Sequence, residues 1–312
     1  MMKSIATNKP IRTNSLRADL IRNRYVYLMV LPVLIYYLVF KYAPMFGLTM
    51  AFQNYRPALG IMGSKWVGLK NFTSFLSSVY AARTIRNTLL INIYQIIFGF
   101  PCPIILALLF NELRSKRYKK VVQTISYMPH FISVMVVCGL LYSFCKSDGL
   151  FNVIGSLFGA ERQNYLSNPA AFRTIYVGSS IWQTMGWSSI LYMATLSNVD
   201  PNLHEAAAID GAGRFRRIWH VTLPALIPVI AIQLIMKFGQ IMTSGYEKVI
   251  LLYNPLTYET ADIISSYVYR RGLEEMNFSV GAAVGMFNSV VNIIILVTAN
   301  AASNKFLHES LW

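Results

Sequence analysis

Long stretches without a charged residue recur along this chain of 312 residues. Four of them cover residues 87–110, 121–145, 174–199 and 276–304. A helix needs about 20 mostly apolar residues to cross a lipid bilayer, so each stretch is long enough for one crossing. Charged residues make up 13% of the chain, against about 25% in ordinary soluble domains. The sequence therefore predicts an all-α membrane protein.

Two further apolar stretches each contain one lysine. Residues 221–246 include Lys237, and residues 25–52 include Lys41, whose ammonium can reach the headgroups while its stem lies on apolar surface. With these two we expect six spanning helices within a domain of residues 25–312. The predicted spans are 25–52, 87–110, 121–145, 174–199, 221–246 and 276–304. The basic segment 1–24 precedes them.

The distribution of positive residues predicts the orientation, because loops on the cytoplasmic side carry an excess of Lys and Arg. The N-terminal segment, the loop after the second span, the loop 200–223 and the C-terminal tail together hold fifteen of the 28 Lys and Arg residues. The opposite loops are longer and hold eleven. Both termini and the loop 200–223 are therefore expected in the cytoplasm. Since the basic residues lie between apolar runs, the net charge of +15 does not indicate a nucleic-acid partner.

Polar residues recur at helical spacing within three predicted spans, and each set marks one face of a helix. The face in 221–246 contains Gln233, Lys237 and Gln240. A lysine in mid-span needs water or a partner, so we favour a water-lined path there. The faces in the second and sixth spans form either such a path or hydrogen bonds between helices, and for the sixth span we favour the bonds. These two faces contain Asn92, Gln95, Asn288 and Asn292.

Trp182 and Trp187, with Gln183 between them, lie in the predicted fourth span. An aromatic face packs well on a sugar ring, whereas packing within the protein core is the alternative and the commoner role. We include Trp182 and Gln183 among the candidates for a polar pathway through the membrane.

The loop between the fourth and fifth spans has a helix–turn–helix pattern. Asp200-Pro201 is a favourable helix start, since Asp accepts from free N–H groups and Pro suits the first turn. Gly211 and Gly213 are expected to end that helix, because glycine adopts a positive φ at low cost. A second short piece, 214–222, leads into the next apolar run.

The same loop reads EAAAIDGAGRFRRIWHVTLP over residues 205–224. Its spacing resembles the EAA loop of permeases in binding-protein-dependent ABC importers, with Val221 where that family more often has Ile. Other stretches resemble the branch of the family associated with polysaccharides and large oligosaccharides. Among them are KYAPMFGLTMAFQNY over 41–55 and QTISYMPHFIS over 123–133.

The resemblance implies a multi-pass protein of the bacterial plasma membrane, with a MetI-like five-helix core, an added N-terminal helix and a cytoplasmic coupling helix at about 202–210. It implies that the subunit pairs with a second, homologous permease and two ATPase subunits, and that an extracellular binding protein delivers a saccharide. ATP and Mg²⁺ would bind to the ATPase subunits. The residues it implies for coupling to the ATPase are Glu205, Ala206, Ala207, Asp210 and Gly211.

Motifs for catalysis or nucleotide binding are absent from the sequence. No GxxxxGK[ST] phosphate-binding loop occurs, so we expect no ATP site of that kind and no cofactor in this chain. No HExxH, GxSxG or Cys–His metal pattern occurs, so we do not expect an enzyme. Cys102, Cys138 and Cys145 lie in or beside apolar runs, where a thiol packs as a small hydrophobic group.

Other interpretations remain open. The loop does not identify the solute, so the chain is alternatively an ABC permease for another solute. A self-contained secondary transporter that uses Lys237 needs no ATPase, although no inverted repeat is visible. A membrane scaffold without transport activity needs no polar face in the fifth span. The tyrosine-rich segment 246–275 is either a docking surface or lid, or a solvated connector.

Overall fold

The structure is a computed structural model that describes residues 16–243, 245–307 and 309–311. These residues form mainly helices, with two strands of two residues each, β1 (Gln53–Asn54) and β2 (Lys65–Trp66), which pair antiparallel. The chain divides into two compact units, residues 1–49 and 50–312. Most of the expected basic segment 1–24 lies outside the described residues.

The described part of the first unit is a run of helical segments. They are α1 (Leu16–Arg22), α2 (Arg24–Tyr37), the π-helical turn η1 (Leu38–Tyr42) and the 3₁₀ segment η2 (Ala43–Phe52), which continues into the second unit. No residue of α2 is buried, and its apolar side chains are exposed along its whole length. Such a surface suits a helix that lies in lipid.

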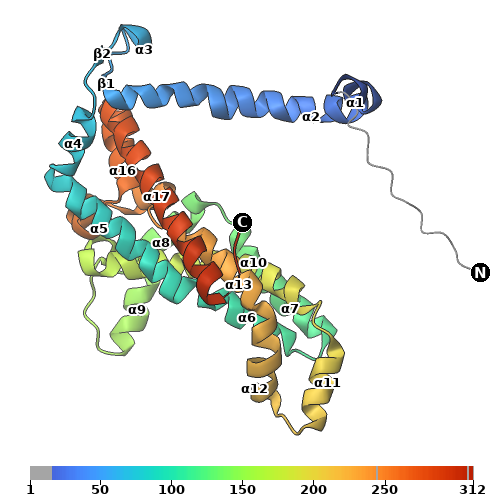
Figure 1. The fold of residues 1–312 in the computed structure, drawn as a ribbon. Coiled ribbons are helices and arrows are strands. Elements are labelled where there is room, and N and C mark those ends of the chain that lie inside the picture. Colours follow the sequence, from blue (N-terminus) through green and yellow to red (C-terminus); the bar gives the residue numbers. More distant parts are fainter. Residues whose placement is uncertain (1–15, 244, 308, 312) are drawn as a thin grey trace, which may run out of the picture. The chain divides into compact units, whose positions relative to one another are not determined.

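The second unit contains the remaining helices (Figure 1). Up to the centre of the chain they are α3 (Gly60–Gly63), α4 (Lys70–Leu76), α5 (Val79–Tyr94), η3 (Gln95–Gly99), α6 (Pro101–Asn111), α7 (Lys116–Tyr127), η4 (Met128–Phe131), α8 (Val134–Cys145), α9 (Leu150–Leu157), η5 (Tyr165–Ser167) and α10 (Pro169–Leu196). After it come α11 (Pro201–Ile209), α12 (Arg214–Arg217), η6 (Ile218–Thr222), α13 (Leu223–Phe238), α14 (Tyr246–Leu252), η7 (Pro255–Thr257), α15 (Tyr258–Ala261), α16 (Ile264–Val268), η8 (Tyr269–Glu274) and α17 (Phe278–Leu307).

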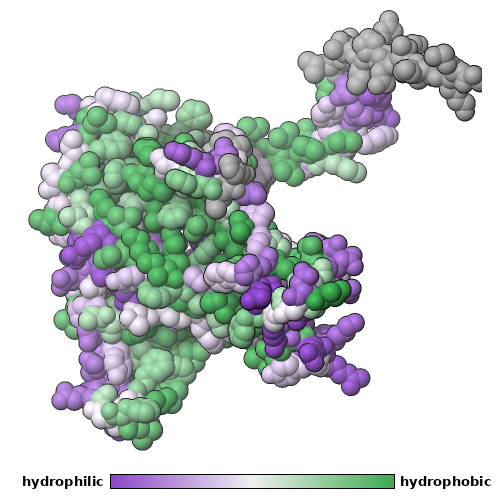
Figure 2. Space-filling view, turned by 60° about the horizontal axis from the view of Figure 1, so that its bottom comes forward, coloured by the Kyte–Doolittle hydropathy of each residue, from purple (hydrophilic) through white to green (hydrophobic). Residues whose placement is uncertain are grey.

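Helix α10 is central to this unit, because it contacts α5, α6, α7, α13 and α15. Hydrophobic side chains cover much of the surface seen in Figure 2. Such a surface suits helices that face lipid, because lipid tails are as apolar as these side chains and the hydrophobic effect does not drive the side chains away from them.

Within the described residues, five helical segments are long and apolar enough to cross a membrane. They are Arg24–Phe52, Val79–Asn111, Val134–Leu157, Arg214–Phe238 and Phe278–Phe306. The prediction of an all-α membrane protein is confirmed at this level. The predicted fourth span coincides with α10, which is 28 residues long but carries Ser, Thr and Gln along its length and is not among the five. The count of six therefore stays a prediction.

The predicted third span, 121–145, is wrong as a single helix. Helix α7 ends at Tyr127, the 3₁₀ turn η4 follows, and α8 starts at Val134 with the Ser133 hydroxyl accepting from its first turn. Pro129 lies in this turn, where its missing N–H and fixed φ favour a helix boundary. Gln183 donates to the carbonyl of Ile132 at 2.9 Å and so satisfies backbone exposed by the break. Hydropathy gave no signal of this interruption, although Pro129 is a local one in the sequence.

The predicted fifth span, 221–246, starts earlier and ends earlier than expected. One helix runs from Arg214 through η6 to Phe238, and Gly239 ends it. A Cβ at Gly239 would lie 2.7 Å from the side chain of Leu296 in α17, so a larger residue there would require the Leu296 side chain to move. Lys237 therefore lies in the last turn of α13 rather than in mid-helix, and Gln240 lies beyond the helix.

The segment 246–275 belongs largely to the core, so its interpretation as a solvated connector is wrong for these residues. Val249, Leu252, Ile263 and Ile264 are buried and pack in two hydrophobic clusters with α5, α8, α10 and α17. Tyrosines and charged residues lie between these apolar residues in the sequence, so the segment did not show a continuous apolar run.

A fully buried carboxylate, Asp262, joins this segment to α5. It accepts from Arg83 and Arg270, each at 2.9 Å, and from the Ser266 hydroxyl at 2.8 Å. Asn87 of α5 donates to the carbonyl of Asp262 at 3.0 Å. Burial alone lowers the pKa of Arg270, but hydrogen bonding and charge attraction from Asp262 outweigh burial and raise it above its ordinary value.

Candidate functional site

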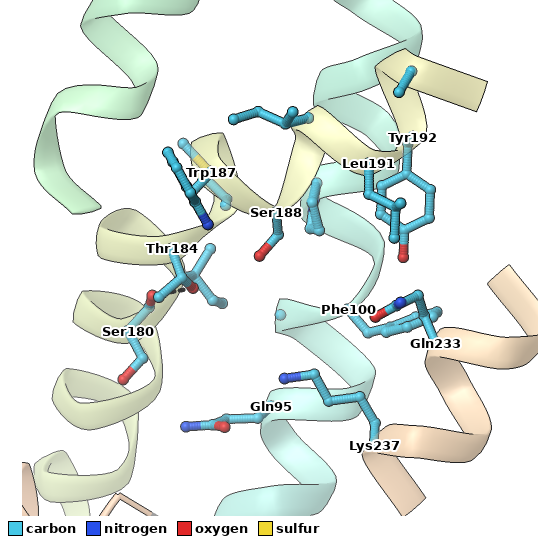
Figure 3. A pocket seen from close by; sticks show the side chains of 16 residues that line it. Gln95, Phe100, Ser180, Thr184, Trp187, Ser188, Leu191, Tyr192, Gln233 and Lys237 are labelled. Atoms are coloured by element: carbon cyan, nitrogen blue, oxygen red, sulfur yellow. Dashed lines mark hydrogen bonds between the residues drawn. The ribbon is translucent and has the colours of Figure 1, made fainter. Parts of the chain in front are cut away.

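A cavity of about 500 Å³ lies between η3–α6, α10 and α13 (Figure 3). Its size is within the range of small-molecule sites, roughly 300–1,000 Å³. The lining residues are Gln95, Gly99, Phe100, Pro103, Ser180, Ile181, Thr184, Met185, Trp187, Ser188, Ile190, Leu191, Tyr192, Ala194, Gln233 and Lys237. Helices from distant parts of the sequence thus bring amide, hydroxyl, ammonium and aromatic groups to one hollow.

Three residues predicted from sequence meet at this cavity. Gln95 starts the π-helical turn η3, whereas Gln233 and Lys237 follow one face of α13. Figure 3 shows the nitrogen of Lys237 directed into the cavity beside Gln95. Within the described residues, the Lys237 ammonium has no hydrogen-bond or ion-pair partner, and no carboxylate lines the cavity. The cavity is therefore cationic.

Of the two tryptophans considered from the sequence, Trp187 lines this cavity and Trp182 does not. The Trp187 ring stacks on His130 with centroids 4.6 Å apart and planes 5° apart, and it contacts Phe131 edge-on. Figure 3 shows its indole nitrogen directed towards the open space. A signal was present in the sequence, since Ser180, Thr184 and Trp187 follow the i, i+4, i+7 spacing of one helix face.

The other predicted pathway residues do not line this cavity. Trp182 lines a second, apolar cavity of about 430 Å³ between α8, α9 and α10. Gln183 supports the break before α8, and Gln240 is exposed beyond the end of α13. Asn92 is buried within α5 and donates to the carbonyl of Thr88 at 2.9 Å.

Neither of the two asparagines of α17 is among the residues that line the cavity. Asn292 accepts from the N–H of Met242 at 3.0 Å and donates to the Thr243 hydroxyl at 2.9 Å, so it holds the segment that follows α13. The Oδ1 atom of Asn288 is buried without a hydrogen bond. Asn292 thus bonds α17 to the segment after α13 and not to another helix, so the hydrogen bonds between helices that were favoured for this face stay a prediction.

Helices α11 and α12 form a hairpin that projects from one end of the second unit (Figure 1). The Asp200 side chain accepts from the N–H of Asn202 at 2.9 Å and caps α11, with Pro201 at its first position. Gly211 has φ +76° after the last turn, and the N–H of Ala212 donates to the carbonyl of Ala207 at 2.8 Å. The local start and stop predicted from sequence are confirmed.

The surface of this hairpin is available for contact. Glu205, Ala206, Asp210 and Gly211 are exposed and Ala207 is half-buried. The Glu205 carboxylate makes no hydrogen bond or ion pair with the described residues. Large apolar side chains are also exposed here, namely Leu203, Ile209, Phe215 and Trp219.

An ion pair fixes the base of the hairpin to the neighbouring helix. Arg214 donates to the Glu112 carboxylate at the end of α6, and also to the Glu112 carbonyl at 3.0 Å.

The exposed apolar side chains of this hairpin, next to the free Glu205 carboxylate, are typical of a protein–protein contact surface.

Among the residues that the structure describes, no group of three His, Cys, Asp or Glu side chains lies close enough to hold a metal ion. The polar groups of the cavity are suited to binding a polar solute by hydrogen bonds and charge.

Comparisons with known proteins agree with the loop pattern. A family model described as "Binding-protein-dependent transport system inner membrane component" matches residues 99–306. The polygalacturonan/rhamnogalacturonan transport system permease protein YteP of Bacillus subtilis (strain 168) is 44% identical, over 97% of this chain and 95% of its own length. Protein LplB of the same strain is 42% identical, over 95% of this chain and 93% of its own.

Two solved structures are similar over nearly the whole chain. One is of a bacterial ABC transporter involved in the import of the acidic polysaccharide alginate, with a TM-score of 0.87, 42% identity and coverage of 94% of this chain and 99% of that one. The other shows a bacterial alginate ABC transporter with an alginate pentasaccharide-bound periplasmic protein, with a TM-score of 0.88, 41% identity and coverage of 96% and 100%.

The resemblance of the loop 205–224 is thereby confirmed. These relatives are transport permeases of the bacterial inner membrane and not enzymes. The chain belongs to the family of binding-protein-dependent transport system inner membrane components, and it is a permease subunit of an ABC importer.

Proposed function

We propose that this subunit takes up a polysaccharide or large oligosaccharide delivered by an extracellular binding protein. The observation that carries the proposal is the cavity with Gln95, Gln233 and Lys237 on one side and Trp187 on the other. Amides both donate to and accept from sugar hydroxyls, and an aromatic wall contacts the apolar faces of sugar rings. The relatives named for saccharide transport support this solute class.

The coupling hairpin is the second part of the proposal. Glu205, Ala206, Ala207, Asp210 and Gly211 lie on or beside α11, and we place the contact with an ATPase subunit there. The small alanines allow close approach, and the free Glu205 carboxylate is available for a polar contact. Two ATPase subunits then hold ATP and Mg²⁺, and a second, homologous permease completes the pathway.

The proposed topology has six crossings with both termini in the cytoplasm. Helix α10 is the crossing that composition alone does not identify; its 28 residues span roughly 42 Å at 1.5 Å per residue. Residues 1–24 then form a cytoplasmic segment and residues 25–312 the permease domain. This arrangement puts α11 on the side where an ATPase is found.

Co-purification and reconstitution test the proposal. A tag on this chain should recover a second permease and an ATPase from the native membrane, and the recovered complex in liposomes should take up saccharide only with ATP and binding protein. ATP-independent uptake by this chain alone would instead establish the secondary-transporter alternative that uses Lys237. Uptake of a different solute class by the complete complex would contradict the saccharide assignment.

A further inference from the structure

Positive charges are concentrated at the start of helix α7. We call them the basic cluster: Arg114, Lys116, Arg117, Lys119 and Lys120, which are exposed except for the half-buried Lys119. No acidic residue occurs between Glu112 and Asp148 in the sequence, and the Glu112 carboxylate already accepts from Arg214. With the residues that the structure describes, the side chains of the basic cluster form no ion pair and no hydrogen bond.

The same helix exposes an apolar stripe. Its members are spaced i, i+3, i+7 and i+10 and so follow one helix face. More than half of each side chain is exposed: Tyr118, Val121, Ile125 and Met128. A different face of α7 packs on α10, where a Cβ at Gly186 would lie 1.9 Å from the carbonyl oxygen of Ser126. This packing leaves the stripe uncovered.

The apolar stripe continues onto a segment that is suited to crossing a membrane. Beyond α7, Phe131, Met135 and Val136 are also exposed, and the last two belong to the apolar segment Val134–Leu157. Water solvates the basic cluster but not the stripe, whereas hydrocarbon covers the stripe at no such cost. An anionic membrane surface suits both, because basic amphipathic helices place their apolar side chains in the acyl region and their cations among the headgroups.

We propose that the basic cluster and the apolar stripe together bind an anionic phospholipid. Arg117 and Val121 are spaced i, i+4, so a guanidinium lies in the same row as the stripe and one turn before it. The lipid phosphate accepts from Arg117 and Lys120, and the acyl chains lie along the stripe. The proposed topology puts α7 on the cytoplasmic side, where anionic lipids give the leaflet its negative surface potential. The inference does not depend on the solute, since no residue of the cluster or the stripe lines the cavity.

The test measures lipid preference beside the stripe in the complete transporter, reconstituted in vesicles. A bimane fluorophore is attached to Ile125→Cys in a chain without native cysteines. Its quenching by doxyl-labelled phosphatidylglycerol is compared with its quenching by doxyl-labelled phosphatidylcholine. The test variant is Arg117→Gln/Lys120→Gln. The matched control, Lys65→Gln/Lys70→Gln, removes two exposed cations from a loop that is expected on the opposite side of the membrane.

We expect phosphatidylglycerol to quench the unsubstituted cluster at a lower mole fraction than phosphatidylcholine. Arg117→Gln/Lys120→Gln should lower this preference about fivefold for each charge removed. The control variant should retain the preference, and so should Arg117→Lys/Lys120→Arg, which keeps both charges. Excess glycerol 3-phosphate should not displace the lipid, because it has no acyl chain to contact the stripe.

Four outcomes would overturn the inference. Equal quenching by the two lipids excludes a selective site, and an equal loss of preference in the control variant indicates only general surface charge. Displacement by glycerol 3-phosphate assigns a site for free phosphate esters. Loss of the co-purified ATPase from Arg117→Gln/Lys120→Gln, with unchanged lipid preference, assigns the cluster to a protein contact. None of these measurements includes saccharide uptake, so the proposed function is tested separately.

Discussion

The buried carboxylate of Asp262 gives the sharpest prediction of stability. Asp262→Asn keeps the size of the side chain and an oxygen that can accept from Ser266, but it removes the charge that Arg83 and Arg270 share. One amide group then faces two guanidinium groups that have lost their carboxylate. Asp148→Asn is the matched control, because Asp148 pairs with Lys146 at 3.3 Å on the surface, where its side chain is 75% exposed.

The two substitutions differ in expected cost. Removing one partner of a buried ion pair costs about 3–5 kcal/mol, whereas an exposed pair contributes about 0–1 kcal/mol. For chains of 150–250 residues, 1 kcal/mol lowers the unfolding midpoint by roughly 2–4 °C. We therefore expect Asp262→Asn to unfold at least about 6 °C below the wild type and Asp148→Asn to stay within a few degrees.

The assay is thermal unfolding of the purified complex in one detergent, followed by tryptophan fluorescence and by retention of the co-purified partner. Because Asp262 links α5 to the segment 246–275, loss of the partner should accompany the early transition. If Asp262→Asn unfolds at the temperature of Asp148→Asn, the network does not stabilise the fold and the reasoning is wrong.

Two other predictions concern the coupling hairpin and the topology. Gly211→Val forces a β-branched residue to φ +76°, at a local cost of about 1–3 kcal/mol, so stimulation of the ATPase by loaded binding protein should be lost. Gly213→Val should retain this stimulation, because Gly213 has φ −65° and open space around its Cβ position. Equal behaviour of the two variants would refute the role of the turn. In a chain without native cysteines, the exposed positions Met62→Cys and Gln163→Cys should react with an impermeant maleimide from outside intact cells. Arg216→Cys should react only after permeabilisation, and external labelling of it would overturn the predicted orientation.

Sequence alone identified the elements that are determined by neighbouring residues in the chain. The start of α11 at Asp200-Pro201 and its end before Gly211 depend on capping groups and a positive φ, and both can be read from neighbouring residues. Gln95, Gln233 and Lys237 were found because a charged or amide group on an apolar helix is costly wherever it lies. These predictions needed no knowledge of tertiary packing.

The missed features depend on contacts between distant residues. The break after α7 is stabilised by Gln183, 51 residues beyond Ile132. Lys248 looked like a loop lysine in the sequence, since nothing nearby in the chain predicts its contact with Ser180, 68 residues away. A hydropathy pattern reports only the composition of a stretch and not what another helix places against it.

If the hairpin of α11 and α12 contacts an ATPase as proposed, the arrangement of helices indicates how its movement reaches the cavity. Two helices lead away from the hairpin, and both carry cavity residues. Helix α10 holds Ser180 and Trp187, and four residues separate its end from α11. The helix that starts at Arg214 ends beside Lys237. Continuous helices transmit displacement along their axes, and Arg214 also ties the hairpin to α6 through Glu112. All three walls are therefore connected to the same hairpin and should move together as one body. If the walls of the cavity move together, the cavity can open or close only where it meets another protein. We therefore infer that opening and closing take place between this subunit and its partner permease. Lys237 and Ser180 should then keep a nearly constant separation throughout.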